Sequence, residues 1–346
     1  MEKQRVPLLL VTDLINIRYA TGFRGTAGVA LFGPEEALLW VDPRYTLQAQ
    51  QEAPRLEVIE EKHGLLRGVA SWLRRNEVRH VGYEPSHLTC AELDQLVRAT
   101  HTRVKFKSAG ALIEELRLVK DQQEIENIRR AGKLIATVFE GVLHQVRPGV
   151  SESDLAAEIE YRIRKNGAER TAFETIVASG IRGAYPHARA SSKLLEKNEF
   201  VIFDLGAILS GYAADMTRTV YLGEPSRRVR NLFYAVVGAQ RRAVEALRAG
   251  VRAGDVDAAA RRAVQARGLG RYFTHSTGHG VGLEVHEGPR LGRGEKTRLK
   301  PGYVVTVEPA VYLEGFGGVR IEDTVLVRPE GPEVLTPACK ENWVIN

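Results

Sequence analysis

The sequence predicts an α/β protein in which a smaller N-terminal domain precedes a larger domain made of two related halves. Three observations lead to this prediction. Strand and helix patterns alternate over roughly the first 110 residues, a segment recurs about 100 residues further along, and acidic residues lie on both hairpins of the repeated region. The chain has 346 residues, enough for two domains. We place the smaller domain at residues 1–115 and the larger at 116–346.

The N-terminal domain is expected to contain a mixed sheet and helices. Short apolar runs bounded by turn residues predict strands at 7–11, 28–32, 37–42, 56–60 and 79–84. Helical periodicity covers 65–76 and 86–99, and Ser86 is the expected N-cap of the second helix. This alternation is typical of a small α/β domain.

The larger domain contains an internal repeat. A long amphipathic helix is predicted over about residues 123–145, ending at a Pro-Gly pair. The segments "RPGVSESDLAAEIEYRIRKNGAE" and "RAGVRAGDVDAAARRAVQARGLG" then match in register, with Gly149 aligned to Gly250 and Gly167 to Gly268. We therefore predict two pseudo-symmetric halves, each a pair of helices followed by a β-hairpin.

Acidic residues occupy corresponding places on the two predicted hairpins. In the first half, "VIFDLGAIL" and "YAADMTRTVYLG" flank a Ser-Gly turn, and pairing about this turn places Asp204 opposite Asp215. In the second half, "VVTVEPAVYL" and "GGVRIEDTVLV" flank "EGFGG", and Glu308 and Glu322 are equally far from Gly315. Each hairpin is therefore expected to carry a pair of facing carboxylates.

Facing carboxylates within apolar strands need a physical reason. Like charges on adjacent strands are destabilising, and buried carboxylates must be protonated, paired or bound to metal. Ion pairs with Arg218 and Arg320 are one explanation. A metal centre is favoured because the pairs recur in both halves. Oxygen-rich ligation suits manganese, cobalt or zinc, and four carboxylates balance the charge of two divalent ions.

The segment "HSTGHGVGLEVHEGP" contains three histidines. His275 and His279 have the spacing of a helical metal-binding pair, but Gly278, Gly280 and Gly282 would each cost a helix about 1 kcal/mol relative to alanine. An extended segment is predicted instead, with His279 and His286 on opposite faces. Only one of these two is then expected to join a given site. The other histidines could donate hydrogen bonds to an oxyanion or move a proton.

Composition bears on location and partners. No apolar run approaches the ~20 residues that span a bilayer, and the apolar stretch near the N-terminus is too short for a signal peptide. A cytoplasmic protein without a membrane partner is therefore expected. The net charge of +6 arises without a long run of like charges, which argues against nucleic acid as a partner. Cys90 and Cys339 are the only cysteines, so a cysteine-based zinc site is implausible.

At these residues the chain resembles the pita-bread metallopeptidases, and among them the Xaa-Pro peptidases aminopeptidase P and prolidase. The resemblance covers nearly the whole chain and rests on "FDLGA", "ADMTRT", "HSTGHGVGLEVHE", "VEPAVY" and "GGVRIEDT", in this order and at the family's spacing. It implies a creatinase/prolidase-like N-terminal domain, a catalytic pita-bread domain and a homodimer.

The resemblance also implies roles for individual residues. The family's ligands for two divalent ions, manganese first and cobalt or zinc as alternatives, fall on Asp204, Asp215, His279, Glu308 and Glu322. The ions would hold a bridging hydroxide, and Glu308 would also assist the attacking water. His187, in "AYPHARAS", and His286 would be catalytic histidines, while His275 and Arg320 would shape the proline side of the site.

The implied reaction is hydrolysis of the bond between the first residue of a peptide and a proline. This bond is a tertiary amide without an N–H, so peptidases that bind that N–H cannot use it. "YATGFRGTAGVALF" and "WVDPRYTLQAQ" favour aminopeptidase P, which releases the first residue of longer peptides; prolidase, which splits Xaa-Pro dipeptides, is the alternative. The intact ligand set argues against creatinase and a non-catalytic binding module, and the N-terminal domain argues against methionine aminopeptidase.

Overall fold

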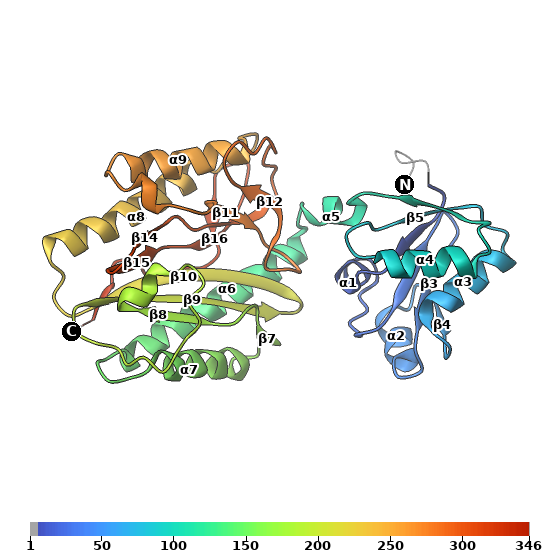
Figure 1. Cartoon of the computed structure of the whole chain (residues 1–346), viewed down its shortest axis with the longest axis horizontal. Helices are drawn as coiled ribbons and strands as arrows, with labels where there is room; N and C mark the ends of the chain where they lie inside the picture. The colour runs from blue at the N-terminus through green and yellow to red at the C-terminus, as the bar shows by residue number, and fades with distance from the viewer. Residues whose placement is uncertain (1–5, 346) are drawn as a thin grey trace. The chain divides into compact units, whose positions relative to one another are not determined.

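The structure, a computed structural model, describes residues 6–345. Two compact units divide the chain, Met1–Arg117 and Leu118–Asn346, and each combines helices with β-sheet (Figure 1). Within the described residues, every helix is too short or too polar to cross a lipid bilayer.

The smaller unit is built around a six-stranded sheet with the spatial order β4-β3-β2-β1-β5-β6. Its strands are β1 Leu9–Val11, β2 Val29–Phe32, β3 Ala37–Val41, β4 Glu57–Glu60, β5 His80–Tyr83 and β6 Lys105–Ser108. Its helices are α1 Leu14–Thr21, α2 Thr46–Glu52, α3 Leu65–Arg75, α4 Cys90–Ala99 and α5 Leu112–Arg117. The β1–β2 and β2–β3 pairs are antiparallel and the others parallel, so the sheet is mixed as predicted.

The N-terminal prediction was wrong at the start of α4. Thr89, and not Ser86, is the N-cap, because its side chain accepts the Glu92 N–H while Glu92 accepts the Thr89 N–H. This capping box is the stronger start signal, and Ser86 lies in the preceding turn. The sequence pattern also did not indicate β6, whose side chains are mostly polar and exposed at the edge of the sheet.

Over residues 118–345, the larger unit contains four long helices and three sheets. The helices are α6 Gln122–Val142, α7 Glu152–Lys165, α8 Arg227–Ala246 and α9 Ala253–Gln265, with short 3-10 turns at Leu143–Gln145, Gly180–Ala184 (η3) and Gly270–Tyr272. The first sheet contains β7 Arg170–Thr171, β8 Ile176–Ser179, β9 Glu199–Leu209, β10 Tyr212–Leu222 and β18 Val344–Ile345. The second contains β11 Gly278–Gly280, β12 Glu287–Leu291, β13 Val304–Val307, β16 Asp323–Leu326 and β17 Glu333–Val334, and a separate pair is β14 Ala310–Leu313 with β15 Gly317–Arg320.

The predicted repeat is present in this unit. Helices α6 and α7 precede the β9–β10 hairpin, and α8 and α9 precede the strands of the second half; the two helix pairs lie on opposite sides of the strands (Figure 1). Gly149 and Gly250, just before α7 and α9, have φ angles of +88° and +86°. Gly167 and Gly268, just after these helices, have +94° and +72°. Since only glycine adopts such angles readily, the aligned glycines mark equivalent turns.

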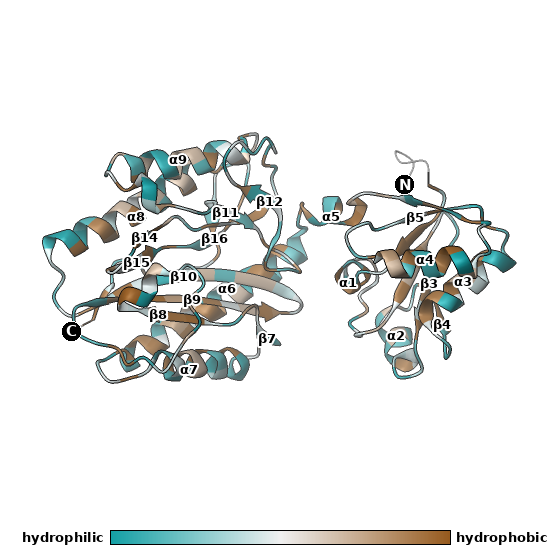
Figure 2. Cartoon of the chain, in the orientation of Figure 1, coloured by the Kyte–Doolittle hydropathy of each residue, from teal (hydrophilic) through white to brown (hydrophobic). Residues whose placement is uncertain are grey.

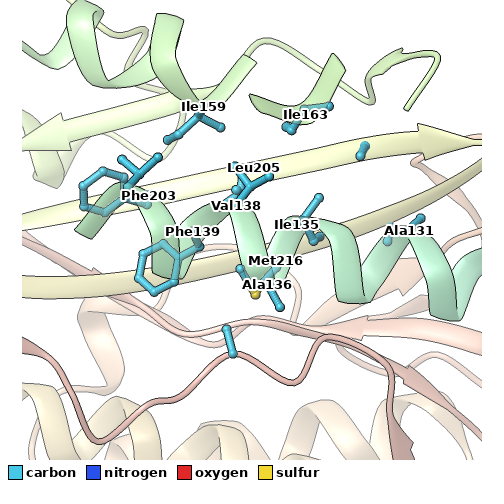
Figure 3. Close-up of a cluster of buried hydrophobic side chains, with 14 of the residues drawn as sticks. Ala131, Ile135, Ala136, Val138, Phe139, Ile159, Ile163, Phe203, Leu205 and Met216 are labelled. Carbon is cyan, nitrogen blue, oxygen red and sulfur yellow. The ribbon is translucent and has the colours of Figure 1, made fainter. Parts of the chain in front are cut away.

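A hydrophobic core fixes the strands of the first half. Ile135 and Phe139 of α6 and Ile159 of α7 pack against Phe203 and Leu205 of β9 (Figure 3). The rings of Phe139 and Phe203 meet edge to face with centroids 5.7 Å apart. Helices α7 and α9 carry hydrophilic and hydrophobic residues on different sides, as expected of helices with one buried face (Figure 2). The core thereby holds the strands that carry the first acidic pair.

Candidate metal centre

The first hairpin is an uninterrupted antiparallel ladder about a two-residue turn. Ser210 and Gly211 have φ angles of +52° and +85°, which suits the tight turn of a hairpin. In the register of the ladder, Asp204 pairs with Thr217, and Asp215 pairs with Gly206. The two aspartates are therefore diagonal neighbours on one face and not directly opposite, so the predicted register was wrong by two residues. The predicted face was right, since a shift of two residues preserves it.

The second hairpin is interrupted where its glutamates lie. The β13–β16 and β14–β15 ladders share one register, so Glu308 and Glu322 face each other across the interruption. Their backbone N–H groups donate to residues outside this hairpin. The Glu308 N–H donates to the Thr277 carbonyl at 2.7 Å, and the Glu322 N–H donates to the Thr217 carbonyl at 3.0 Å. The interruption therefore connects these glutamates to the histidine segment and to the first hairpin.

A cavity of about 650 Å³ gathers the predicted site residues. All nine line it: His187, Asp204, Asp215, His275, His279, His286, Glu308, Arg320 and Glu322. Tyr312, which the sequence reasoning missed, lines it as well. The sequence contained a signal for this residue. Tyr312 lies four residues after Glu308 and two after Ala310, so an extended chain places all three side chains on the same face.

The donor atoms in the cavity fit a divalent metal. Atoms of Asp215, His279 and Glu322 lie within 4.8 Å of one another. His279 Nε2 is 3.5 Å from Glu308 Oε1 and 3.9 Å from Asp215 Oδ2. One carboxylate oxygen of Asp204 and one of Asp215 are buried without a hydrogen-bond partner. Because buried polar atoms are nearly always satisfied, these oxygens and the imidazole are suitable ligands for a cation.

Burial sets the pKa values of these groups. It raises the pKa of Glu308 to about 7, and it raises the pKa values of Asp215 and Glu322 well above their usual range, with further increases from neighbouring carboxylates. Burial also lowers the pKa of His279 to about 4, so its imidazole is neutral at pH 7 and able to bind metal. The cluster thus requires either protons or cations to neutralise its charge.

Arg320 brings a buried positive charge to the same cavity. Its guanidinium pairs with Asp204 at 2.5 Å and donates hydrogen bonds to the Tyr312 hydroxyl at 2.7 Å and the Pro186 carbonyl at 3.0 Å. His275 Nε2 lies 3.1 Å from the same tyrosine hydroxyl, and burial lowers the pKa of His275 to about 4. Arg320, Tyr312 and His275 therefore form one connected wall of the cavity.

The ion-pair explanation of the carboxylates holds only in part. Arg320 pairs with Asp204, but the fully buried Arg218 pairs with Asp323 at 2.7 Å, and not with any of the four predicted carboxylates. A single guanidinium cannot neutralise four acidic groups. The remaining charge favours the metal explanation.

The histidine segment differs from the predicted extended strand. Gly278–Gly280 forms a short strand, the chain bends between residues 281 and 286, and β12 begins at Glu287. The rings of His279 and His286 come to lie 4.3 Å apart, so both line the cavity, and the prediction that only one could do so was wrong. Gly280 permits the bend, because a Cβ there would lie 1.9 Å from the Gly288 carbonyl oxygen. This close approach depends on tertiary contacts that strand periodicity does not report.

The fold and this centre define a pita-bread metallopeptidase. The model of Metallopeptidase family M24 matches residues 126–329, and that of the Creatinase/Prolidase N-terminal domain matches residues 1–119. The chain belongs to metallopeptidase family M24, whose members use divalent metals.

Several relatives match over 96% or more of their length. An Xaa-Pro dipeptidase of Pyrococcus furiosus is 36% identical over 99% of this chain and 96% of its own. The structure of an Xaa-Pro dipeptidase from Bacillus anthracis has a TM-score of 0.95 at 38% identity, covering 99% of this chain and 96% of that one. An X-Pro aminopeptidase from Thermotoga maritima has a TM-score of 0.91 at 36% identity, covering 100% of both chains.

Proposed function

We propose that this chain is a metal-dependent peptidase that hydrolyses Xaa-Pro bonds, with dipeptides as its substrates. The observation that carries the proposal is the cavity in which four carboxylates, neutral histidines and Arg320 meet, in a chain related along its whole length to Xaa-Pro peptidases. The sequence motifs favoured aminopeptidase P. The relatives named as dipeptidases support the alternative, prolidase, better, although one neighbour is an aminopeptidase.

A positive charge on the cavity wall offers a physical reason for dipeptide preference. In an Xaa-Pro dipeptide a free carboxylate follows the scissile bond within one residue, whereas in longer peptides that position is a neutral amide. Arg290 lines the cavity and is exposed, and Arg189, also in the lining, pairs with Glu174 at 3.2 Å. Because a guanidinium binds a carboxylate more strongly than a neutral amide, we assign to Arg290 the recognition of the dipeptide's carboxylate.

The proposed roles of the other residues follow from their places in the cavity. Two divalent ions, manganese first and cobalt or zinc as alternatives, would be held by Asp204, Asp215, His279, Glu308 and Glu322. When bound, such ions supply Lewis-acid chemistry and lower the pKa of water. Glu308 would accept a proton from the attacking water. The exposed His187 and His286 would hydrogen-bond the developing oxyanion, and the wall of His275 and Arg320 would receive the proline ring. A homodimer and a cytoplasmic location remain predictions.

The proposal is tested by comparing Leu-Pro with Leu-Pro-Gly, and with Leu-Gly as a control, on protein loaded with manganese. We expect kcat/KM for Leu-Pro to exceed that for Leu-Pro-Gly by at least about tenfold, since a charge-assisted hydrogen bond contributes ~1.5–3 kcal/mol. In Arg290→Gln this ratio should fall toward one, mostly through the KM of the dipeptide. Preference for the tripeptide would instead identify an aminopeptidase. Metal-loaded protein that cleaves neither peptide would contradict the peptidase proposal.

A further inference from the structure

Glu152, the first residue of α7, is a fully buried carboxylate outside the cavity. It accepts five hydrogen bonds, and all come from the segment 179–191, which carries His187. The donors are the Ser179 N–H and hydroxyl, both at 2.8 Å, the Arg182 Nε at 2.9 Å, and the Ser191 N–H and hydroxyl at 3.1 Å and 2.8 Å. One buried side chain thus binds both ends of this segment.

The backbone at the start of α7 strengthens this attachment. The Glu152 N–H donates to the Lys193 carbonyl at 3.0 Å, and the Ser153 N–H donates to the Ser191 carbonyl at 2.9 Å. Within the segment, Arg182 also donates a hydrogen bond to the Arg189 carbonyl. These contacts close residues 179–191 into a loop whose base is Glu152, and we call it the His187 loop.

The cavity holds the other end of the His187 loop. Arg320 donates to the Pro186 carbonyl, directly beside His187. The 3-10 turn η3 of the loop packs against β15 so closely that a Cβ on Gly318 would lie 2.1 Å from the Gly183 carbonyl oxygen. His187 itself is exposed where it lines the cavity, and it is carried there by the backbone of the loop. Its position therefore depends on how the loop is anchored.

The second half anchors its histidine segment in a similar way. Asp257 of α9, also buried, accepts the Thr277 N–H at 3.2 Å and the Thr277 hydroxyl at 2.8 Å. Arg261 pairs with Asp257 at 2.7 Å and donates to the His275 carbonyl at 2.5 Å. In both halves, then, a buried carboxylate of the second helix, paired with an arginine, binds the segment that brings a histidine to the cavity. The recurrence supports a positioning role for such groups.

We propose that Glu152 is a positioning residue that acts through His187. It holds the two ends of the His187 loop so that the imidazole faces the carboxylate cluster. The inference rests on the proposed function, because it assumes that His187 serves the reaction. Displacing a catalytic group by about 1 Å can reduce turnover about 100-fold, and the loss of a supporting contact around a metal site commonly costs about 10–100-fold.

The first test compares Glu152→Gln with Glu158→Gln. Glu158 lies on the same helix, but its side chain accepts hydrogen bonds from Arg162 and Gln145, which lie outside the loop. In Glu152→Gln one carboxylate oxygen becomes an amide NH₂, which cannot accept the hydrogen bonds from the loop. We expect kcat on Leu-Pro to fall about 10–100-fold in this variant, with KM and bound metal per chain changed less than about threefold. Glu158→Gln should match the wild type. Loss of metal in proportion to activity would overturn the proposal.

A double variant separates positioning from a general structural effect. If Glu152 acts through His187, then Glu152→Gln should reduce kcat less than about threefold further when His187→Ala is already present. The same 10–100-fold loss in both backgrounds would overturn the proposal. Should Glu152→Gln fail to fold, Ser191→Ala replaces it, because it removes one hydroxyl donor and leaves the charge in place; the same comparison then applies with an expected loss of about 3–10-fold.

Hydrogen exchange makes the result independent of the peptidase proposal. Amides of residues 180–191 should exchange faster in Glu152→Gln than in the wild type. In Glu158→Gln they should exchange at the wild-type rate, whether or not any peptide is cleaved. Faster exchange in a protein without Xaa-Pro activity would mean that the loop anchor exists and the proposed function is wrong. Unchanged exchange would mean that Glu152 does not anchor the loop.

Discussion

The two halves of the larger unit carry their acidic pairs on hairpins of different construction. In the first half, β9 and β10 pair without a break over eleven residues each. In the second, the ladder stops at Glu308 and Glu322 and resumes beyond them. Pro309 is one cause of the break, because it has no N–H to donate to the ladder.

The comparison shows what the break accomplishes. In an unbroken ladder the backbone groups of a strand bond to the neighbouring strand. In the interrupted hairpin the N–H groups of Glu308 and Glu322 instead donate to the carbonyls of Thr277 and Thr217. In addition, a threonine of each half hydrogen-bonds an acidic residue of the other half. The Thr217 hydroxyl donates to Glu322 Oε2 at 2.6 Å, and the Thr324 hydroxyl donates to the Asp215 carbonyl at 2.8 Å. The halves share a chain pattern but form a single site.

The largest expected effect comes from removing one carboxylate of either half. We expect Asp215→Asn and Glu322→Gln to lose bound metal and to reduce kcat/KM by about 1,000-fold or more, because each removes a charged ligand from the centre. The metal-free variants should be at least as thermally stable as the metal-free wild type, since burial and neighbouring carboxylates make these groups costly when ionised.

Metal analysis and thermal unfolding in the presence of a chelator measure both effects. Glu174→Gln is the matched control, because Glu174 lines the same cavity but is exposed and paired with Arg189. If only one of Asp215→Asn and Glu322→Gln lost its metal, the two halves would not share one metal centre.

The sequence predicted the repeat, the acidic hairpins and nine of the residues that line the cavity, because these depend on periodicity, on the alternation of faces along a strand and on motif resemblance. It predicted the face of Asp204 and Asp215 but not their register, since turn geometry sets register. The bend that brings His286 beside His279 arises from contacts with other strands. Glu152 was missed because nothing in the sequence of a helix start indicates which distant loop will bond to it.

A smaller and unequal effect is expected from the two threonines that link the halves. The Thr217 hydroxyl bonds a proposed ligand side chain, Glu322. The Thr324 hydroxyl instead bonds the backbone of Asp215: it donates to the Asp215 carbonyl and accepts the Asp215 N–H at 3.1 Å. Thr217→Val should therefore weaken metal affinity about 10–100-fold. Thr324→Val should change affinity less and lower stability by about 1–3 kcal/mol, because it leaves buried backbone groups unpaired.

Titration with manganese against a competing chelator, together with urea unfolding of the metal-free proteins, distinguishes the two variants. Equal losses of affinity would mean that the threonines act by holding the halves together. The difference between the unbroken first hairpin and the interrupted second hairpin would then have no consequence for metal binding.

The last effect, expected on stability alone, tests the contact between the second hairpin and the His187 loop. A Cβ on Gly318 would lie 2.1 Å from the Gly183 carbonyl oxygen and 2.9 Å from Tyr312 Cδ1, so Gly318→Ala must displace backbone. We expect it to lower the free energy of unfolding by about 1–3 kcal/mol. The control is Gly238→Ala in α8, where a Cβ meets nothing within 4 Å and alanine should raise helix stability by about 1 kcal/mol. Urea unfolding should give opposite signs for the two variants, because Gly318 makes room for a neighbouring backbone and Gly238 does not. If Gly318→Ala were as stable as Gly238→Ala, the close approach of the hairpin and the loop would not be a constraint on the fold.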